Sequence, residues 1–372
     1  MPPLRIGVNA LYLIPGGVGG TEIYLRSLLR ALSEIDPNNR YFLFTNRETG
    51  ADLTPHAANF SSEVQPVHAA SRPRRLLWEQ AWLPRLAESL DVMFNPGFTA
   101  PLGAACPQVT VFHDLQHKRH REFFRWFDRP AWDFLLYWSV KVSKRLIAVS
   151  EATAADLVRY YRVPQQKVAV VPHGVDPEFH AIAARRSPEP FLLSVSTLHP
   201  HKNLDNLLRA FAEFRRTKPQ FRLVICGLHG FVAGPLHELR DALGLRDAVD
   251  FPGWIPRAEL YDLFRRAWAF FYPSRFEGFG MPVIEALAAG VPTACSAIEP
   301  LRSLAGGAAL LFDPLDGKAI LEAMVRLTSE ESERARLAAA GPARAADFSW
   351  PEAARQTLDI LYQAAGPSRV SG

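Results

Sequence analysis

The stretch Glu277-Gly278-Phe279-Gly280-Met281-Pro282-Val283-Ile284-Glu285 decides the fold expected for the second half of this 372-residue chain. It places two carboxylates eight positions apart around a glycine-rich turn. Pro282 suits the first position of a helix, because its fixed φ is helical and its missing N–H is not needed there. Gly290 is a typical helix stop. The pattern predicts a loop that carries Glu277, followed by a helix that carries Glu285.

Such a loop has a recognisable binding chemistry. A helix N-terminus offers backbone N–H groups and the positive end of a dipole to an anion. Carboxylates cannot bind a phosphate, but they accept hydrogen bonds from hydroxyl groups. A ligand with phosphates and many hydroxyls, such as a nucleotide sugar, therefore fits both features. The alternative is an ordinary turn whose Glu only complements the helix dipole.

Length and composition restrict the class of protein. A chain of 372 residues predicts two domains, and 48% hydrophobic with 22% charged residues is typical of globular proteins. The net charge of +4 permits contact with anionic surfaces, and no nucleic-acid-binding motif accompanies it.

Three scattered cysteines favour a reducing compartment. Without a signal peptide or an apolar stretch of about 20 residues, we expect a cytoplasmic protein that meets a membrane, if at all, from its inner face.

Short apolar strands alternate with helices along most of the chain, which predicts an α/β fold of parallel βαβ units. This alternation of strands and helices stops after Gly174, where three prolines and an Arg-Arg pair follow. We therefore predict two doubly wound, Rossmann-like domains at residues 1–174 and 191–349, with a linker over 175–190 and a final helix over 350–366. A ligand cleft between the domains is expected where strand C-termini and helix N-termini converge.

Three further segments have residue types suited to a phosphorylated ligand. Glycines 16, 17 and 19 follow the first predicted strand and open a helix, although the same pattern is common in tight turns. His113 ends a predicted strand, where it either faces the cleft or makes local hydrogen bonds. Lys202 lies just before a helix, where it can face a diphosphate or remain a solvated surface side chain.

Residues 117–130 combine basic and aromatic side chains. Such a segment can dock on an anionic membrane surface, or it can pack its aromatics inward. The residues alone leave both interpretations open. No metal-ligand cluster and no D-x-D pair is present, so we expect no metal site.

In this order along the chain, the motifs resemble the signature of glycosyltransferase family 4, of the group 1 type. The resemblance extends over nearly the whole sequence and rests on the following segments: Gly16-Gly17-Val18-Gly19, His113-Asp114-Leu115, Ile147-Ala148-Val149-Ser150-Glu151, Pro172-His173-Gly174-Val175-Asp176, Thr197 to Leu204, Gly253-Trp254, Pro273 to Ala286, and Phe348-Ser349-Trp350.

The resemblance implies a GT-B architecture, with an acceptor-binding N-terminal domain and a C-terminal domain that binds the nucleotide sugar. The last helix would cross back to the N-terminal domain. The implied chemistry is retaining sugar transfer without metal or cofactor. The implied donor is a GDP- or UDP-linked sugar, and the implied acceptor is a glycan or a lipid-linked molecule.

Carried onto the matching positions, the resemblance also implies site roles. His113 would orient the reacting sugar, Glu277 would contact the donor sugar, and Lys202 would stabilise the diphosphate. Glu285 would accept hydrogen bonds from the ribose. The remaining implied donor-binding residues are Gly16, Gly17, Gly19, Thr197, Ile255, Gly278, Phe279, Gly280 and Met281.

The chain departs from the family pattern at three positions. Thr197 and His201 stand where many relatives have arginine, and Ser303 stands where many have glutamate. One basic contact to the diphosphate is therefore missing or supplied elsewhere. The leading hypothesis is a glycosyltransferase of bacterial cell-surface polysaccharide or glycolipid synthesis, with mannose as the preferred sugar. The alternatives are a sugar-nucleotide epimerase of the same fold and a non-catalytic binding member of the family.

Overall fold

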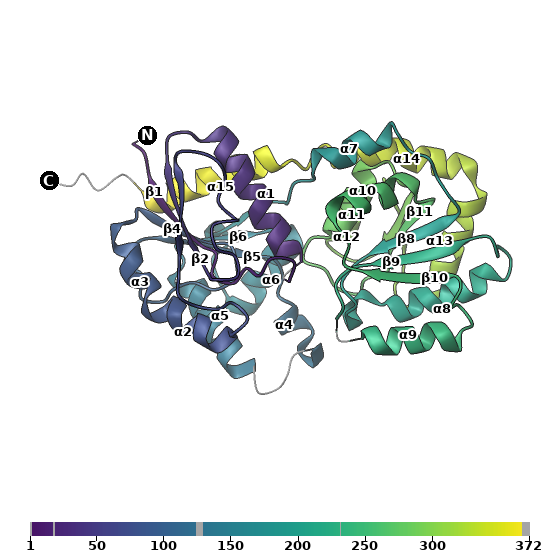
Figure 1. Ribbon diagram of the computed structural model, residues 1–372, viewed down its shortest axis with the longest axis horizontal. Helices are drawn as coiled ribbons and strands as arrows, with labels where there is room; N and C mark the ends of the chain where they lie inside the picture. Colours follow the sequence, from purple (N-terminus) through teal and green to yellow (C-terminus); the bar gives the residue numbers. More distant parts are fainter. Residues whose placement is uncertain (1, 18, 124–128, 231, 367–372) are drawn as a thin grey trace. The chain divides into compact units, whose positions relative to one another are not determined.

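The computed structural model describes residues 2–17, 19–123, 129–230 and 232–366. The chain divides into two compact units, one of residues 1–174 together with the chain from Trp350 onward, and one of Val175–Ser349. Each unit is a parallel β-sheet with helices packed around it (Figure 1). The prediction of two Rossmann-like α/β domains is confirmed.

The first unit contains a seven-stranded sheet in the order β3-β2-β1-β4-β5-β6-β7. Its strands are β1 (Arg5–Asn9), β2 (Arg40–Thr45), β3 (Phe60–Val64), β4 (Val92–Asn95), β5 (Gln108–Phe112), β6 (Arg145–Ala148) and β7 (Val168–Val170). Its helices are α1 (Gly20–Ile35), α2 (Arg72–Ala81), α3 (Leu83–Leu86), α4 (Gln116–Arg119), α5 (Arg129–Val142), α6 (Glu151–Tyr161) and α15 (Trp350–Ala365).

The second unit contains a six-stranded sheet in the order β10-β9-β8-β11-β12-β13. Its strands are β8 (Phe191–Val195), β9 (Arg222–Cys226), β10 (Val249–Gly253), β11 (Ala269–Tyr272), β12 (Thr293–Ser296) and β13 (Leu310–Phe312). Its helices are α7 (Pro177–Ala183), α8 (Leu204–Arg215), α9 (Ala233–Ala242), α10 (Arg257–Arg266), α11 (Met281–Ala288), α12 (Leu301–Ala305), α13 (Gly317–Ser329) and α14 (Glu331–Ala345).

Both sheets reverse their strand order once, between β1 and β4 and between β8 and β11. At such a switch point the loops leave in opposite directions, and the crevice outside the strand C-termini is the usual ligand site of doubly wound sheets. The loops that follow β8 and β11 contain Lys202 and Glu277, respectively. The topology alone therefore brings these two residues to one edge of the sheet.

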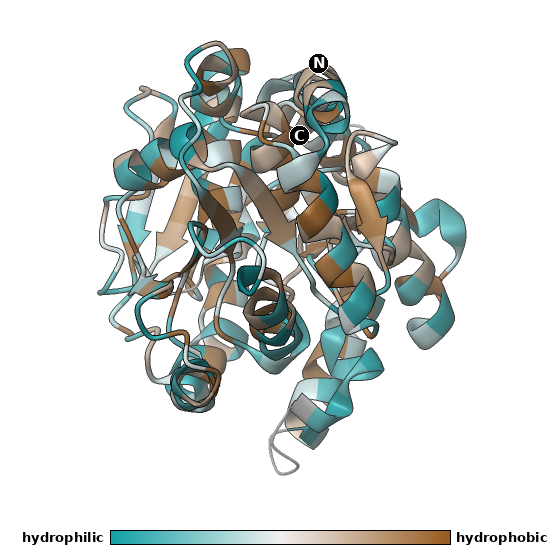
Figure 2. Ribbon diagram, turned by 90° about the vertical axis from the view of Figure 1, so that its right-hand side faces the viewer, coloured by the Kyte–Doolittle hydropathy of each residue, from teal (hydrophilic) through white to brown (hydrophobic). Residues whose placement is uncertain are grey.

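Apolar periodicity explains why these helices cover the sheets. In α8, Leu204, Leu207, Leu208, Phe211 and Phe214 recur at helical spacing and are all buried against the second sheet. Each such side chain contributes about 1.5–3 kcal/mol through its burial. Figure 2 shows the same division in space, with apolar strands inside and polar helix surfaces outside.

The linker predicted over residues 175–190 is not a separate segment in the structure. Residues Pro177–Ala183 form α7, which packs on α10 and α11 of the second unit. Asp176 and Pro177 give the helix its start, and Phe179 and Ile182, three positions apart, are buried. A helix of this length has too few apolar positions to show a clear period in the sequence.

The loops at the C-terminal edge of the second sheet approach each other very closely. A Cβ atom added to Gly227, which follows β9, would lie 2.0 Å from the carbonyl oxygen of Ser196, and its φ of +149° also disfavours a side chain. The atom that an added Cβ would strike belongs to the backbone of Ser196, which cannot shift without a large energetic cost. Glycine at position 227, directly after β9, is therefore what allows the loop after β8 to approach so closely.

We predict that Gly227→Ala lowers the free energy of unfolding of the protein by more than about 3 kcal/mol, because strain and overlap add. Gly244→Ala is the matched control, since Gly244 also has a positive φ of +68° but nothing within 4 Å of an added Cβ. We expect it to cost about 1–2 kcal/mol. Urea denaturation measures both variants, and equal losses would contradict the close approach.

Candidate functional site

The centre of the second unit's C-terminal edge is an ion pair between two of the predicted residues. Lys202 Nζ lies 2.6 Å from Glu277 Oε1, and the two side chains are only 13% and 10% exposed. Lys202 Nζ also donates a hydrogen bond of 3.0 Å to the hydroxyl of Tyr272, the last residue of β11. The structure therefore brings Lys202 and Glu277 together, although they lie 75 positions apart.

Tyr272 contacts Lys202 and is also influenced by the charge of Glu285, the second carboxylate of the sequence signature. Burial raises the pKa of the Tyr272 hydroxyl, and the nearby carboxylates of Glu277 and Glu285 raise it further. Tyr272 therefore stays protonated and can donate its hydroxyl hydrogen to a carboxylate. Sequence reasoning missed this residue, and the only signal was its position as the last strand residue before the signature.

Glu285 lies in α11 and is almost completely buried. Burial raises the pKa of its carboxyl group, and the guanidinium of Arg257 opposes this shift from 3.0 Å away. Arg257 is a second residue that the sequence analysis missed, because nothing in its spacing connects it with Glu285. The side chain of Glu285 is thus held by a cation at the same edge of the sheet as Lys202.

The start of α11 offers backbone donors beside these side chains. The helix begins at Met281, one residue before the predicted start, and Gly280 precedes it with a φ of +108°. This φ strains any residue that has a Cβ atom, and an added Cβ would also displace the end of the Leu301 side chain, 2.4 Å away. Within the described part of the chain, the N–H groups of Gly280 and Met281 have no recorded hydrogen-bond acceptor. These amides can therefore receive an anion.

A buried asparagine fixes the two loops against each other. Asn203 adopts a left-handed conformation and donates hydrogen bonds to the carbonyl oxygens of Pro273 and Pro314, at 3.0 and 2.7 Å. Its side-chain oxygen accepts a hydrogen bond of 2.7 Å from Arg275. Asn203 thus sets the position of the neighbouring Lys202. The sequence suggested only a helix start here.

The other donor-binding residues predicted in this unit lie around the same edge. Thr197 follows β8 and is half-buried. Gly278 and Phe279 precede α11, and Phe279 is buried with its ring 5.9 Å from that of Phe348. Ile255 follows β10 and lines an open groove of about 900 Å³ beneath α10.

The histidines of the loop after β8 form a close pair. His199 Nδ1 and His201 Nδ1 are 2.6 Å apart, so one nitrogen carries the proton and the other accepts it. Burial, with the charge of Lys202, lowers the pKa of His199. The side chain of His201 is therefore engaged by that of its neighbour His199.

The glycine loop and His113 belong to the first unit. Gly16 N–H donates a hydrogen bond of 2.8 Å to Glu22, and Gly17 N–H donates one of 2.8 Å to the carbonyl oxygen of Ile14. Gly19 precedes α1 as its N-cap, and Val18 lies outside the described residues. The amides of Gly16 and Gly17 are thus engaged within the loop itself.

His113 lies in a buried aromatic cluster that joins three of the recognised motifs. Its ring is 4.8 Å from that of Tyr24 and 5.5 Å from that of His173, which stacks on Trp350 at 5.9 Å. Burial lowers the pKa of His113 to about 4, so the imidazole is neutral at neutral pH. Because the carbonyl oxygen of Pro96 can only accept, the Nε2 of His113 donates to it at 2.8 Å, which leaves Nδ1 as an acceptor.

Three basic side chains at the start of the segment 117–130, those of Lys118, Arg119 and Arg121, are paired within the first unit. Lys118 and Arg121 form ion pairs with Asp133, and Arg119 forms one with Asp156. Residues 124–128, which hold most of the aromatics of this segment, lie outside the described residues. Over the part of the chain that is described, none of the helices is long and apolar enough to cross a bilayer.

Two family models match adjacent parts of the chain. The model "Glycosyltransferase Family 4" matches residues 18–179, and the model "Glycosyl transferases group 1" matches residues 175–344. Among curated proteins, the O-antigen chain mannosyltransferase B of Escherichia coli is 28% identical over 313 residues, which is 77% of each chain.

Solved structures share the fold at low sequence identity. The structure of Anabaena HepE in complex with UDP and glucose has a TM-score of 0.75 at 18% identity, covering 96% of this chain and 99% of its own. The structure of WaaG, a glycosyltransferase involved in lipopolysaccharide biosynthesis, has a TM-score of 0.76 at 15% identity, with the same two coverages. With both family models matched in sequence order and this fold, the chain belongs to the group 1, family 4 glycosyltransferases and has the GT-B architecture.

Proposed function

We propose that the chain transfers a sugar from a nucleoside-diphosphate donor to a glycan or lipid-linked acceptor, with retention of the anomeric configuration. The observation that carries this proposal is the cluster of Lys202, Glu277 and Tyr272 beside two open helix amides at the switch point of the second sheet. A cation, open amides and carboxylates at one place match a ligand with both phosphates and hydroxyls.

Each group has a distinct task in this proposal. When the bond between the sugar's anomeric carbon and the diphosphate breaks, negative charge grows on the leaving phosphate oxygens. Lys202 and the amides of Gly280 and Met281 stabilise that charge, and they need no reorganisation because the fold already holds them. Glu277 accepts hydrogen bonds from hydroxyls of the transferred sugar, and Glu285 accepts them from the ribose.

His113 contributes a hydrogen-bond acceptor rather than a charge. Its neutral imidazole has Nδ1 as the accepting atom. We infer that this atom orients a hydroxyl of the reacting sugar. A buried neutral histidine suits that task, because it does not add a positive charge beside an anomeric carbon that becomes positive during the reaction.

The names of relatives favour one setting and one sugar. Mannosyltransferases of O-antigen chains and a glycosyltransferase of lipopolysaccharide biosynthesis are among the similar proteins. We therefore propose cell-surface polysaccharide synthesis, with a GDP-mannose donor as the first choice and UDP-sugars as the second. An epimerase of the same fold would turn over the donor without acceptor, and a non-catalytic member would bind it unchanged.

We predict that one nucleoside diphosphate among GDP, UDP, ADP, CDP and dTDP raises the melting temperature of the protein. A ligand at about 100 times its dissociation constant adds about 2.7 kcal/mol to the free energy of unfolding. Glu285→Ala should lose most of this effect, because the ribose loses its acceptor. Asp262→Ala, which removes an exposed carboxylate of α10, is the control and should keep it. Absence of any shift in the wild type would contradict donor binding.

We also propose that the first unit contacts anionic membrane through the outer face of α5. Phe134, Tyr137, Trp138 and Lys141 recur there at helical spacing, and all four are exposed. Aromatic rings with an adjacent cation are suited to the interface of an anionic bilayer. This face differs from residues 117–122, whose basic side chains are paired within the unit.

We predict that the double variant Phe134→Ala/Trp138→Ala binds vesicles of phosphatidylglycerol and phosphatidylcholine at least about tenfold more weakly than the wild type, because each buried aromatic contributes above 1.4 kcal/mol. Leu315→Ala is the control, since Leu315 is an exposed apolar residue of the second unit. Co-sedimentation measures the binding. Equal binding by the wild type and the double variant would overturn the assignment of this face.

A further inference from the structure

Arg257 lies between two carboxylates in the second unit. It is the first residue of α10, and its Nη1 is 3.0 Å from Glu285 Oε1 while its Nη2 is 3.6 Å from Asp176 Oδ2. The side chains of Arg257, Glu285 and Asp176 are 31%, 5% and 29% exposed, respectively. Glu285 is thus the most deeply buried member of this network, and Arg257 connects it to the residue that precedes α7.

The remaining contacts of Arg257 fix its orientation. Its Nε donates a hydrogen bond of 3.2 Å to the hydroxyl of Tyr261, which in turn donates one of 2.6 Å to Asp176 Oδ2. The guanidinium also lies over the ring of Phe179, with 4.9 Å between its central carbon and the ring centroid. With all three nitrogens engaged and one flat face covered, the planar guanidinium has little freedom to turn.

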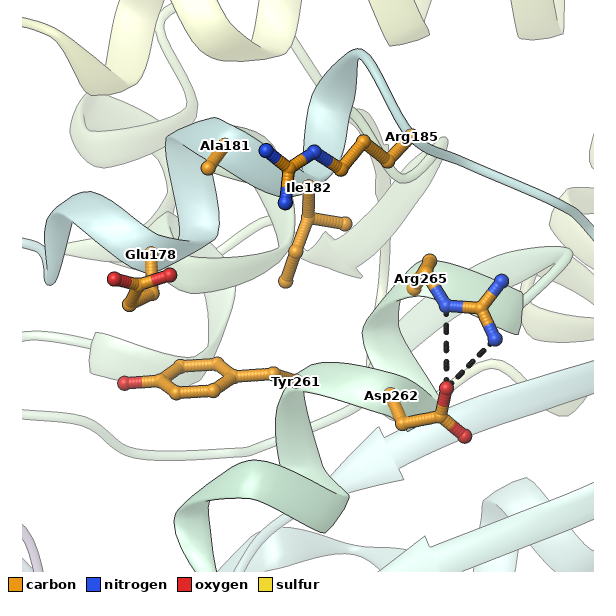
Figure 3. A pocket seen from close by; sticks show the side chains of 7 residues that line it. All are labelled: Glu178, Ala181, Ile182, Arg185, Tyr261, Asp262 and Arg265. Atoms are coloured by element: carbon orange, nitrogen blue, oxygen red, sulfur yellow. Dashed lines mark hydrogen bonds and ion pairs between the residues drawn. The ribbon is translucent and has the colours of Figure 1, made fainter.

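Tyr261, which supports Arg257, lies beside a groove between α7 and α10. Figure 3 shows the Tyr261 side chain extending from α10 toward one end of a groove, with Glu178 of α7 facing it. The ion pair of Arg265 with Asp262 lies at the other end of the same groove. Arg265 is therefore a neighbour on the same helix that takes part in a separate contact.

The contact with Arg257 engages one of the two carboxylate oxygens of Glu285. Oε1 faces Arg257, and among the described residues no hydrogen bond to Oε2 is recorded. Burial raises the pKa of this carboxyl group, and the charge of Arg257 counteracts the rise. A buried carboxylate that is held by one oxygen presents the other in a defined direction.

We propose that Arg257 is the positioning residue for recognition of the donor's ribose. Its charge favours the ionised form of Glu285, and its contact holds Oε1 in one orientation, so that Oε2 accepts hydrogen bonds from the ribose hydroxyls. Asp176 and Tyr261 hold Arg257 from the other side. Arg257 itself does not touch the donor. This inference rests on the proposed function, in which Glu285 is the ribose acceptor.

The experiment compares nucleotides with and without the ribose hydroxyls. The dissociation constants of GDP and UDP, and of their 2′,3′-dideoxy counterparts, are measured by calorimetry. Wild type should bind the ribonucleotide at least about tenfold more tightly, since hydrogen bonds to a charged acceptor are strong. Glu285→Ala and Arg257→Gln should both reduce this preference to less than about threefold. Arg265→Gln, the matched control on α10, should retain it.

The ratio of the two dissociation constants separates positioning from general support of the fold. A loosened second unit would weaken both nucleotides alike and leave their ratio at the wild-type value, which would overturn the inference. If Arg257→Gln does not fold, Arg257→Lys replaces it. Lysine keeps the charge but cannot hold three partners, so the preference should fall severalfold, and an unchanged preference would overturn the inference.

Failure of the proposed function has a different signature. If neither GDP nor UDP binds to the wild type, both the proposed function and this inference fall. If Glu285→Ala abolishes the ribose preference while Arg257→Gln retains it, the proposed function stands and only the positioning role of Arg257 is overturned.

Discussion

The ion pair between Lys202 and Glu277 is costly to hold where it lies. Both side chains are largely withdrawn from water, and a withdrawn charge loses hydration energy that its partner recovers only in part. The hydroxyl of Tyr272 adds a further contact to the ammonium group, and Asn203 fixes the loop from which Lys202 extends. A well-packed apolar pair would stabilise the fold equally well, so we attribute the two charges to the proposed binding of the donor. The pair lies at the switch point of the sheet, in the loops that follow β8 and β11, and the glycine start of α11 comes three residues after Glu277.

The two units differ in the charge of the side chains at their sheet edges. The second unit concentrates charge, with Lys202, Arg257 and two carboxylates. The first unit buries a neutral His113 among aromatic rings and occupies the amides of its glycine loop with its own Glu22 and Ile14.

Much of the fold could be predicted from the sequence, because strands and helices alternate with strong apolar periods. The helix α7 could not, since only Phe179 and Ile182 mark its buried face. Lys202, Glu277 and Glu285 were predicted from motif spacing, and the structure places all three at one edge of the second sheet. Tyr272, Asn203 and Arg257 were missed because their partners come from distant segments. The contact of Arg257 with Glu285, for instance, exists only once β10 and β11 have taken their places in the sheet.

The most direct test is a crystal structure of the protein with GDP or UDP, whichever binds more tightly. We expect the diphosphate within hydrogen-bonding distance of Lys202 and of the amides of Gly280 and Met281, with the ribose hydroxyls at Glu285. A nucleotide bound elsewhere, with Lys202 still engaged only by Glu277 and Tyr272, would contradict the account of this site.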